Sequence, residues 1–386
     1  MSNEAFLKFT TPMLDDSAIA EVTDVLRSGW LTTGPRVKKF EDMLQEYLGG
    51  RRSLAVSSAT AGLHIACLAI GLKEGEEVIT TPLTFVATLN TIVQAGAKPV
   101  LVDIEKNGLN IDVAQIEAAI TPRTKAIMPV HFAGAPVDLD PLYALAKKHN
   151  LRVIEDCAHA IGTEYKGKKL GAFGDIQIFS FHPNKNITTG EGGCVTTADP
   201  EIIHKIERLR FHGIDRDAFN RFGKGGSQHY DIVLPGFKYN MMDIQAALGI
   251  HQLPKLDGFI AEREKRAKIY QERLKGWTEL SLPIAPNYNH RHAWHLYTPL
   301  IESPMGRDGF IEAMKEENIG LGLHYTAAHL FTYYRERFGY KQGQFPNTEN
   351  AASKICSLPL FPTMTSAEQE RVIAAMAKIF KKRMAA

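Results

Sequence analysis

Two charged residues, Lys185 and Asp156, lie next to apolar runs, where a charge is costly to bury, and both could be catalytic. Lys185 lies in the segment SFHPNKNITTGEGG, between an apolar run and a glycine-rich turn. An ammonium group is costly to bury, but burial lowers its pKa and makes the amine competent to form a Schiff base. Asp156 ends the apolar run LRVIED. The alternative to a catalytic role is, for Lys185, a lysine on a surface loop and, for Asp156, a carboxylate held by a structural salt bridge or a helix cap.

Two further segments carry free N–H groups, hydroxyls and an aromatic ring. Ala59 and Thr60 follow the run LAVSS and begin a predicted helix. The N–H groups at such a helix start can cradle a phosphate, although N-capping by Ser58 or Thr60 would produce the same pattern. Phe85 follows EEVITTPLT. It could pack into the core or offer its face to another aromatic ring.

A single ligand, pyridoxal phosphate (PLP), would explain all four segments. Its phosphate suits the helix start, its ring the aromatic face, its pyridine nitrogen the carboxylate and its aldehyde the lysine. Lys185 would form the Schiff base, the internal aldimine. Asp156 would keep the ring nitrogen protonated, so that the ring withdraws electrons from the reacting carbon. The sequence therefore predicts a PLP enzyme with Lys185 and Asp156 as its catalytic residues.

The elements that must position these residues form an α/β pattern. Seven short β-branched runs occur between residues 54 and 197, and helix-like segments separate most of the first five, which predicts a mostly parallel sheet. DIQIFSF and GGCVTT are joined too closely for a helical crossover, so one antiparallel strand is expected there. A long helix is predicted over residues 242–276. We expect a large domain, 1–240, and a smaller α+β domain, 241–386.

The composition excludes several classes of function. The 386 residues carry a net charge of only +2, which gives no reason to expect nucleic-acid binding. No apolar run is long enough to cross a membrane, and no targeting signal is recognised. Four separated cysteines indicate buried free thiols in a reducing compartment, and we therefore expect a cytoplasmic protein.

Several motifs resemble one protein family over nearly the whole chain, from WLTTGP to SLPLFP. They are VSSATAGLHIA, TPLTFVATLN, VIEDCAHAIGTEYKGKKLG, SFHPNKNITTGEGG and GFKYNMMDIQAAL. They are similar to motifs of the DegT/DnrJ/StrS sugar-nucleotide aminotransferases, which are PLP enzymes of fold type I, the aspartate aminotransferase fold. The resemblance implies glutamate as amino donor, 2-oxoglutarate as its product, and a keto sugar linked to a nucleotide as amino acceptor.

The resemblance also implies roles for particular residues. His159 should lie near the phenolic oxygen of the PLP ring, and Phe85 should stack on the ring. Three residues should hold the phosphate: Ala59, Thr60 and Ser180. The family forms homodimers with sites at the subunit interface, and Asn240 matches an asparagine that reaches across to the phosphate of the neighbouring subunit.

The sugar itself stays open between alternatives. ITPRTKAIMPVHFAGAPVDLD, HAWHLY and GLGLHYTAAH resemble the UDP-4-amino-4-deoxy-L-arabinose (ArnB-type) aminotransferases, which aminate C4 of a UDP-4-keto-pentose. Pro183 and the run TGEGG also resemble enzymes that act on UDP-4-keto hexoses, and a dTDP-linked hexose is a further alternative. For the function as a whole, a further alternative is a regulatory protein that binds the cofactor or a sugar nucleotide without turnover.

Histidines and basic residues remain to be placed. His292 and His295 would point to opposite faces of a strand over HAWHLY, so we predict no metal site there. Four residues are candidates for the substrate pocket, with hydrogen-bonded packing as the alternative: His182, His295, His324 and Tyr325. The Gly- and Arg-rich stretch 216–226 resembles a loop that could meet a diphosphate.

Overall fold

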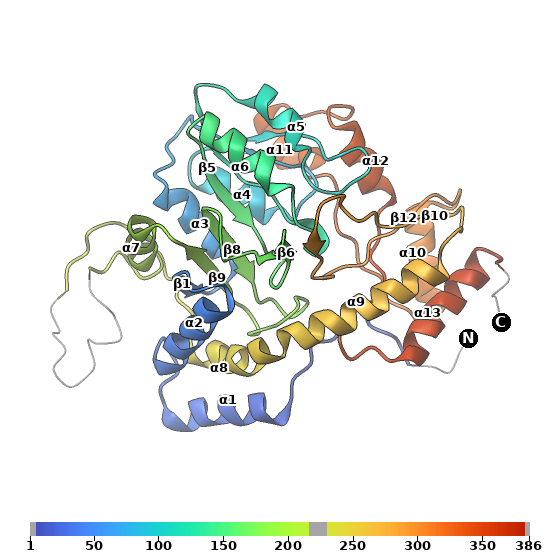
Figure 1. The fold of residues 1–386 in the computed structure, drawn as a ribbon, viewed down its shortest axis with the longest axis horizontal. Coiled ribbons are helices and arrows are strands. Elements are labelled where there is room, and N and C mark those ends of the chain that lie inside the picture. Colours follow the sequence, from blue (N-terminus) through green and yellow to red (C-terminus); the bar gives the residue numbers. More distant parts are fainter. Residues whose placement is uncertain (1–4, 216–229, 383–386) are drawn as a thin grey trace.

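The computed structural model describes residues 5–215 and 230–382. A seven-stranded sheet forms its centre (Figure 1). The strand order is β1 (Ser53–Val56), β9 (Gly193–Thr197), β8 (Ile176–Ser180), β5 (Arg152–Asp156), β4 (Thr124–Ile127), β2 (Glu77–Thr80), β3 (Lys98–Leu101). Strand β9 runs in the opposite direction to the other six strands of this sheet. The mostly parallel sheet and its single antiparallel strand are therefore confirmed.

Helices cover both faces of the sheet, which explains why its strands are apolar on both sides. One face packs against α3 (Ala59–Ala69), α4 (Ala87–Gln94) and α7 (Pro200–Leu209). The other packs against α2 (Pro35–Tyr47), α6 (Leu139–Lys148) and α8 (Asp243–Gln252). Successive residues of β5 show the alternation, because Val153 joins the second core and Ile154 the first. The short α5 (Val113–Ile116) joins the second core through Ile116, and α1 (Asp16–Ser28) packs on the outside of α8.

The long helix predicted over 242–276 is interrupted. The chain forms α8, then a 3₁₀ turn over Leu253–Lys255, and then α9 (Leu256–Arg273). Pro254 lies in this turn, where its missing N–H and its ring prevent regular α-helical hydrogen bonding. The helix prediction was correct in kind but wrong about its continuity.

The C-terminal part has its own core, built on α10 (Gly306–Glu316) and α13 (Ser366–Ile379). It also contains α11 (Thr332–Phe338), α12 (Pro346–Lys354), a 3₁₀ turn over Ala328–Leu330 and the paired two-residue strands β10 (Leu280–Ser281) and β12 (Leu300–Ile301). A further strand, β11 (His290–Arg291), pairs with β6 (Glu164–Tyr165) of the large part. Helix α9 belongs to both cores: Phe259 and Ile260 pack with the sheet, and Tyr270 packs with α10 and α13. The domain boundary at residue 240 stays a prediction.

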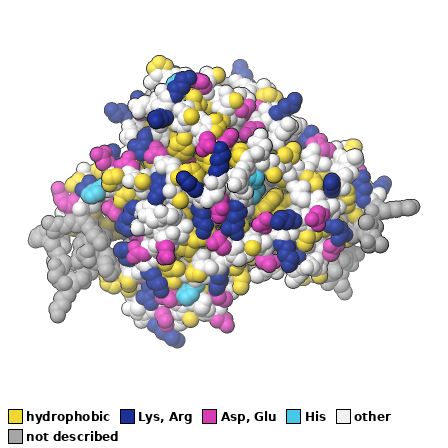
Figure 2. All heavy atoms as spheres, in the orientation of Figure 1, with side chains coloured by type: hydrophobic (Ala, Val, Ile, Leu, Met, Phe, Trp, Pro, Cys, Tyr) yellow, Lys and Arg dark blue, Asp and Glu magenta, His cyan; other side chains and the backbone are white. Residues whose placement is uncertain are grey.

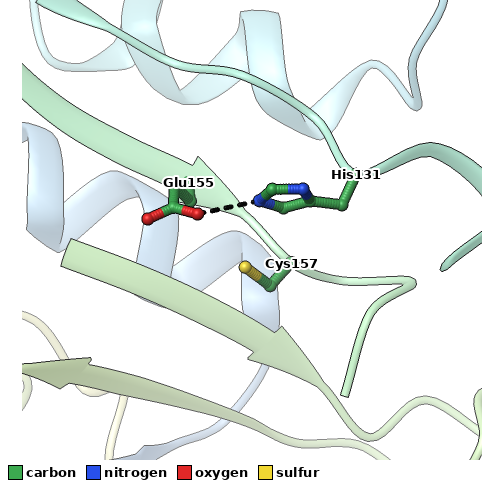
Figure 3. A group of neighbouring side chains, drawn as sticks. All are labelled: His131, Glu155 and Cys157. Atoms are coloured by element: carbon green, nitrogen blue, oxygen red, sulfur yellow. Dashed lines mark hydrogen bonds and ion pairs between the residues drawn. The ribbon is translucent and has the colours of Figure 1, made fainter. Parts of the chain in front are cut away.

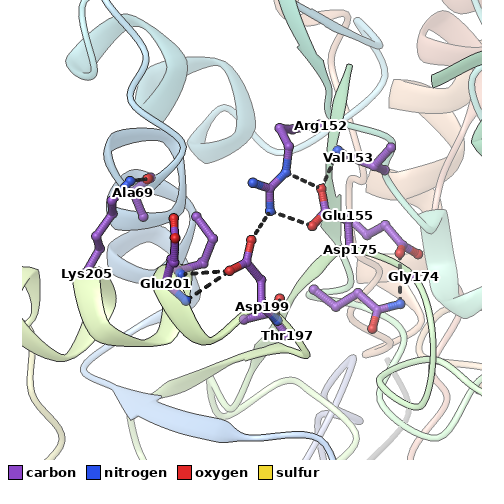
Figure 4. Close-up of polar contacts among 12 residues, drawn as sticks. Ala69, Arg152, Val153, Glu155, Gly174, Asp175, Thr197, Asp199, Glu201 and Lys205 are labelled. Atoms are coloured by element: carbon purple, nitrogen blue, oxygen red, sulfur yellow. Dashed lines mark hydrogen bonds and ion pairs between the residues drawn. The ribbon is translucent and has the colours of Figure 1, made fainter. Parts of the chain in front are cut away.

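A cluster of charges closes the edge of the sheet at which β5 begins (Figure 4). Arg152 donates to both carboxylate oxygens of Asp175, at 2.7 and 2.8 Å, and to Asp199 at 3.1 Å. Asp199 also caps α7 by accepting from the N–H groups of Glu201 and Ile202. The first residue of β5 therefore lies in an ion cluster, whereas its last residue, Asp156, has no ion-pair partner within the described residues.

The outer surface carries intermingled charges. Basic and acidic side chains alternate over the face shown in Figure 2. Among the helices of the described ranges, none is long and apolar enough to span a bilayer. The four cysteines are buried and free, as predicted.

Gly193 should tolerate no side chain, because a Cβ there would lie 2.6 Å from the backbone nitrogen of Ala59 and 2.9 Å from the carbonyl oxygen of Phe179. We expect Gly193→Ala to lower the free energy of unfolding by about 1–3 kcal/mol. Gly258→Ala is the matched control: it lies within α9 with open space around it, and it should stabilise the helix by up to about 1 kcal/mol. Urea unfolding measures both, and equal stability of the two variants would contradict the close approach.

Candidate active site

Lys185 lies in the turn that follows β8, where its N–H donates to the carbonyl of His182 at 2.8 Å. The residue is partly buried. Burial lowers the pKa of its amine to about 8, and the Asp156 carboxylate opposes that shift. Lys185 is therefore not a freely exposed lysine on a surface loop. An amine of this pKa is partly neutral near physiological pH and can act as a nucleophile or a base.

Asp156 is buried at the last position of β5. One carboxylate oxygen accepts from the hydroxyl of Thr88 at 2.8 Å, and the other accepts from the N–H of Ala158 at 3.0 Å. Burial raises the pKa of this carboxyl, while the two hydrogen bonds and Lys185 oppose the shift. No cation of the described chain lies within ion-pair distance of it, so the structural salt bridge is not observed. A cationic partner is what this site still needs.

His159 is buried beside these two residues. Its Nδ1 accepts from the backbone N–H of Ala133 at 3.2 Å, and its Nε2 lies 2.9 Å from the hydroxyl of Tyr325. Burial and the nearby Lys185 hold the pKa of the imidazole well below its usual value. The ring is therefore neutral, and Lys185 lies near enough to contribute to this lowering of the pKa.

His295 packs against His159, with ring centroids 4.4 Å apart. The predicted strand over HAWHLY is wrong, because Trp294 has a left-handed backbone, φ 46°, and its N–H donates to Nδ1 of His292 at 2.8 Å. The resulting turn sends His292 onto the Trp294 ring and His295 into the site. Both ring nitrogens of His295 are buried without a hydrogen-bond partner.

Phe85 and His324 complete this group of side chains. Phe85 is 56% exposed, so core packing does not explain it, and its ring centroid lies 5.9 Å from that of Tyr325. His324 contacts the hydroxyl of Ser357 at 2.9 Å and interacts electrostatically with Lys185. The structure thus brings seven predicted residues together: Lys185, Asp156, His159, His295, His324, Tyr325 and Phe85.

A second group lies at the start of α3. Ser58 caps the helix by accepting from the N–H of Ala61 at 3.1 Å, so the capping alternative holds for Ser58. Ser180 pairs with Gly193 across β8 and β9, and the Cα of Gly193 lies against Ala59. Ala59, Thr60 and Ser180 therefore surround one helix N-terminus, a geometry suited to a phosphate.

Two predicted residues are not joined to these groups. His182 is half exposed, and its ring contacts Asn184 at 2.8 Å. Asn240 is buried, donates to the Thr33 hydroxyl and leaves its Oδ1 without a partner. It lines a cavity of about 550 Å³ between α2 and α7. The stretch 216–226 lies outside the described residues.

Behind the site, His131, Glu155 and Cys157 stand close enough to hold a metal ion (Figure 3). Their hydrogen bonds are already made. His131 Nδ1 accepts from the N–H of Val137, so its Nε2 donates to Glu155 at 2.9 Å. The other oxygen of Glu155 accepts from Tyr143 at 2.6 Å and from a glutamine amide at 2.8 Å, and burial raises the pKa of the Cys157 thiol. The group is a satisfied structural network.

The residues present fit PLP. A buried carboxylate with no cation of the described chain at ion-pair distance suits a protonated pyridine nitrogen, a lysine of lowered pKa suits the aldehyde, and the helix N-terminus at Ala59 suits the phosphate. This sheet and this set of residues define a PLP-dependent enzyme with the aminotransferase fold. The chain belongs to the DegT/DnrJ/EryC1/StrS aminotransferase family, whose sequence model matches residues 12–377.

Individual relatives resemble the chain over their full length. The spore coat polysaccharide biosynthesis protein SpsC of Bacillus subtilis is 44% identical, over 97% of each chain. Helicobacter pylori PseC, an aminotransferase involved in the biosynthesis of pseudoaminic acid, is 31% identical with a TM-score of 0.90, covering 98% of this chain and 100% of its own. Spr1654 from Streptococcus pneumoniae, solved in its PLP form, is 30% identical with a TM-score of 0.89, covering 98% and 99%.

The sequence did not reveal every contributor to the site. Thr88 lies three residues after Phe85 on the first turn of α4, and this helical spacing could have indicated that both face the site. The N–H of Ala133 could not have been found, because a backbone donor leaves no trace in side-chain chemistry.

The lowered pKa of Lys185 should make the stability of the cofactor-free protein depend on pH. Below pH 8 the lysine is protonated in both the folded and the unfolded chain. Between about 8 and 10.5 only the unfolded chain holds the proton, so the free energy of unfolding should rise with pH. Lys185→Met should remove a rise of about 3 kcal/mol. Urea titrations from pH 7 to 10 measure it, with exposed Lys39→Met as control; parallel curves for wild type and Lys185→Met would contradict the burial effect.

Proposed function

We propose that this aminotransferase moves the amino group of L-glutamate to the keto carbon, C4, of a nucleotide-linked sugar, with a UDP-4-keto-pentose as the first candidate. The observation that carries the proposal is that one site holds both Lys185, whose pKa burial lowers, and the buried carboxylate of Asp156. Asp156 is the last residue of β5 and Lys185 follows the adjacent strand β8, so both stand at the carboxyl ends of strands, where open α/β sheets bind their ligands.

Lys185 would hold the cofactor and move protons. PLP supplies an electron sink when bound, which stabilises negative charge at the carbon next to the amino nitrogen. As a neutral amine, Lys185 would take the proton from Cα of glutamate. In the reverse direction it would give a proton to the sugar carbon that receives the nitrogen. A pKa near 8 suits both duties, because such a group exchanges protons readily in either direction near neutral pH.

Asp156 would keep the pyridine nitrogen protonated. Its charge is buried, so a cationic N–H nearby would stabilise the carboxylate far more than water-exposed groups could. Thr88 and the N–H of Ala158 hold the two oxygens in place. The carboxylate therefore needs no reorganisation when charge develops on the substrate carbon.

The amino acceptor is inferred from resemblance. The names of SpsC and PseC concern a polysaccharide and pseudoaminic acid, which supports a sugar substrate. The motifs of residues 120–140 and 320–329 support the pentose. Pro183 and the run TGEGG support the alternative, a UDP- or dTDP-linked 4-keto hexose.

A homodimer in the cytoplasm is part of the proposal. Apolar side chains of Ile19 and Leu26 are 56% and 55% exposed on α1, and Met242 is 43% exposed beside it. A second subunit would cover such a surface. The unpartnered Oδ1 of Asn240 is available to a neighbouring subunit, and four free buried cysteines support a reducing compartment.

Glutamate should convert the visible absorbance of the PLP enzyme to the near-ultraviolet band of pyridoxamine phosphate. Lys185→Ala should abolish this conversion, with a rate at least about 10⁴-fold lower, because among the lysines of residues 5–215 and 230–382 only Lys185 influences the Asp156 carboxyl. Lys39→Ala, on the exposed face of α2, is the control and should convert normally. Conversion at an ordinary rate by Lys185→Ala, or none by the wild type, would overturn the proposal.

A panel of UDP- and dTDP-linked 4-keto pentoses and hexoses, offered to the pyridoxamine form, should identify the sugar. We expect return of the visible absorbance with the UDP-4-keto-pentose at a kcat/KM at least about tenfold above that with any hexose, a difference of about 1.4 kcal/mol. A preference for a hexose would select the alternative, and the absence of any reaction would reject a nucleotide-linked sugar as acceptor.

A further inference from the structure

The hydrogen bonds of His159 leave only one arrangement of its protons. Nδ1 faces the backbone N–H of Ala133, which can only donate. The imidazole is neutral, so its single hydrogen must be on Nε2. Nε2 has the hydroxyl of Tyr325 at 2.9 Å as its partner. The tyrosine oxygen therefore accepts this hydrogen bond.

The donor that fixes this tautomer is itself held firmly. Ala133 has a left-handed backbone, φ 57°, which costs energy for any residue with a side chain. Its neighbours keep it there: the N–H of Phe132 donates to Asn110 at 3.0 Å, and the carbonyl of Gly134 accepts from Thr163 at 2.7 Å. The N–H of Ala133 consequently cannot turn away from the ring.

Tyr325 is left with a hydrogen to donate. Its hydroxyl accepts from His159, and no acceptor for its own proton is found in the described chain. The ring is held at its edge by Phe132, with centroids 6.1 Å apart and planes at 84°, and it lies near Phe85. The contact of its hydroxyl with Nε2 of the buried His159, at 2.9 Å, places the hydroxyl in the site. The phenol is thus an oriented donor that faces the position of the ligand.

We propose that the Tyr325 hydroxyl donates its hydrogen bond to the phenolic oxygen of PLP, and that His159 acts as the positioning residue that orients it. This inference rests on the proposed function, because it takes the PLP ring to lie beside His159. It revises the role expected for His159: that residue has no hydrogen left to give to the cofactor, and Tyr325 gives it instead.

Removing the donor should change the spectrum of the bound cofactor. The absorbance of PLP linked to Lys185 changes with pH as the linkage loses its proton. A donor to the phenolate withdraws negative charge, so its loss should raise the midpoint of this titration by about one pH unit or more. We expect that shift in Tyr325→Phe and none in Tyr333→Phe, whose ring is 50% exposed on α11. An unchanged midpoint in Tyr325→Phe would overturn the assignment.

The tautomer can be measured without cofactor. In the wild-type protein labelled with ¹⁵N-histidine, and with the signal identified by its loss in His159→Gln, Nε2 should carry the proton and Nδ1 should show the shift of an unprotonated nitrogen. A proton on Nδ1 would overturn the inference, whatever the spectra show. Neither measurement needs turnover, so failure of the proposed amino transfer would be recognised separately, by the glutamate half-reaction.

Discussion

The buried carboxylate of Asp156 is the constraint on which the rest of the site depends. It ends a strand in the middle of the sheet, between β4 and β8, where water cannot solvate it. Two hydrogen bonds hold it, from Thr88 on α4 and from the chain just beyond the strand, but no cation balances it within the described residues. A charge in this position destabilises the empty fold unless a cationic ligand meets it. Cofactor binding and protein stability are therefore coupled through one side chain.

The two ends of β5 show how the fold divides its polar groups. At the first residue, the charge of Arg152 is balanced by hydrogen-bonded ion pairs with Asp175 and Asp199. At the far end, Glu155 is equally saturated but points to the opposite face, where Tyr143 and His131 hold it. The last side chain of the strand, Asp156, instead lies in a site where hydrogen bonds stay incomplete within the described chain: both His295 nitrogens lack a partner, and the Tyr325 hydroxyl has no acceptor for its proton. Polar groups with completed hydrogen bonds shape the protein, and those without them define where a ligand must bind.

Much of this was predictable from the sequence, and the exceptions have physical causes. Alternating strands and helices, and the short link before Gly193, predicted the sheet correctly because they depend on local patterns and chain length. The residues at strand ends also came together as expected, since parallel strands share one edge. Failures occurred where one residue overrode a pattern: Pro254 broke a continuous helix, and the left-handed Trp294 turned an apparent strand into a loop. The donors around His159 could not be predicted, because their roles depend on backbone geometry.

Helix α9 begins in the core of the sheet and ends in the core of the C-terminal part. Between these two attachments the buried guanidinium of Arg263 donates to the carbonyls of His295 and Leu360, at 3.2 and 2.7 Å. Helix α9 is therefore attached at three places: to the core of the sheet, to the core of the C-terminal part and, through Arg263, to the segment that carries His295. A rotation of the C-terminal part relative to the sheet must therefore either bend α9 or displace His295. The catalytic pocket and the spacing between the two halves of the molecule are in this way mechanically linked.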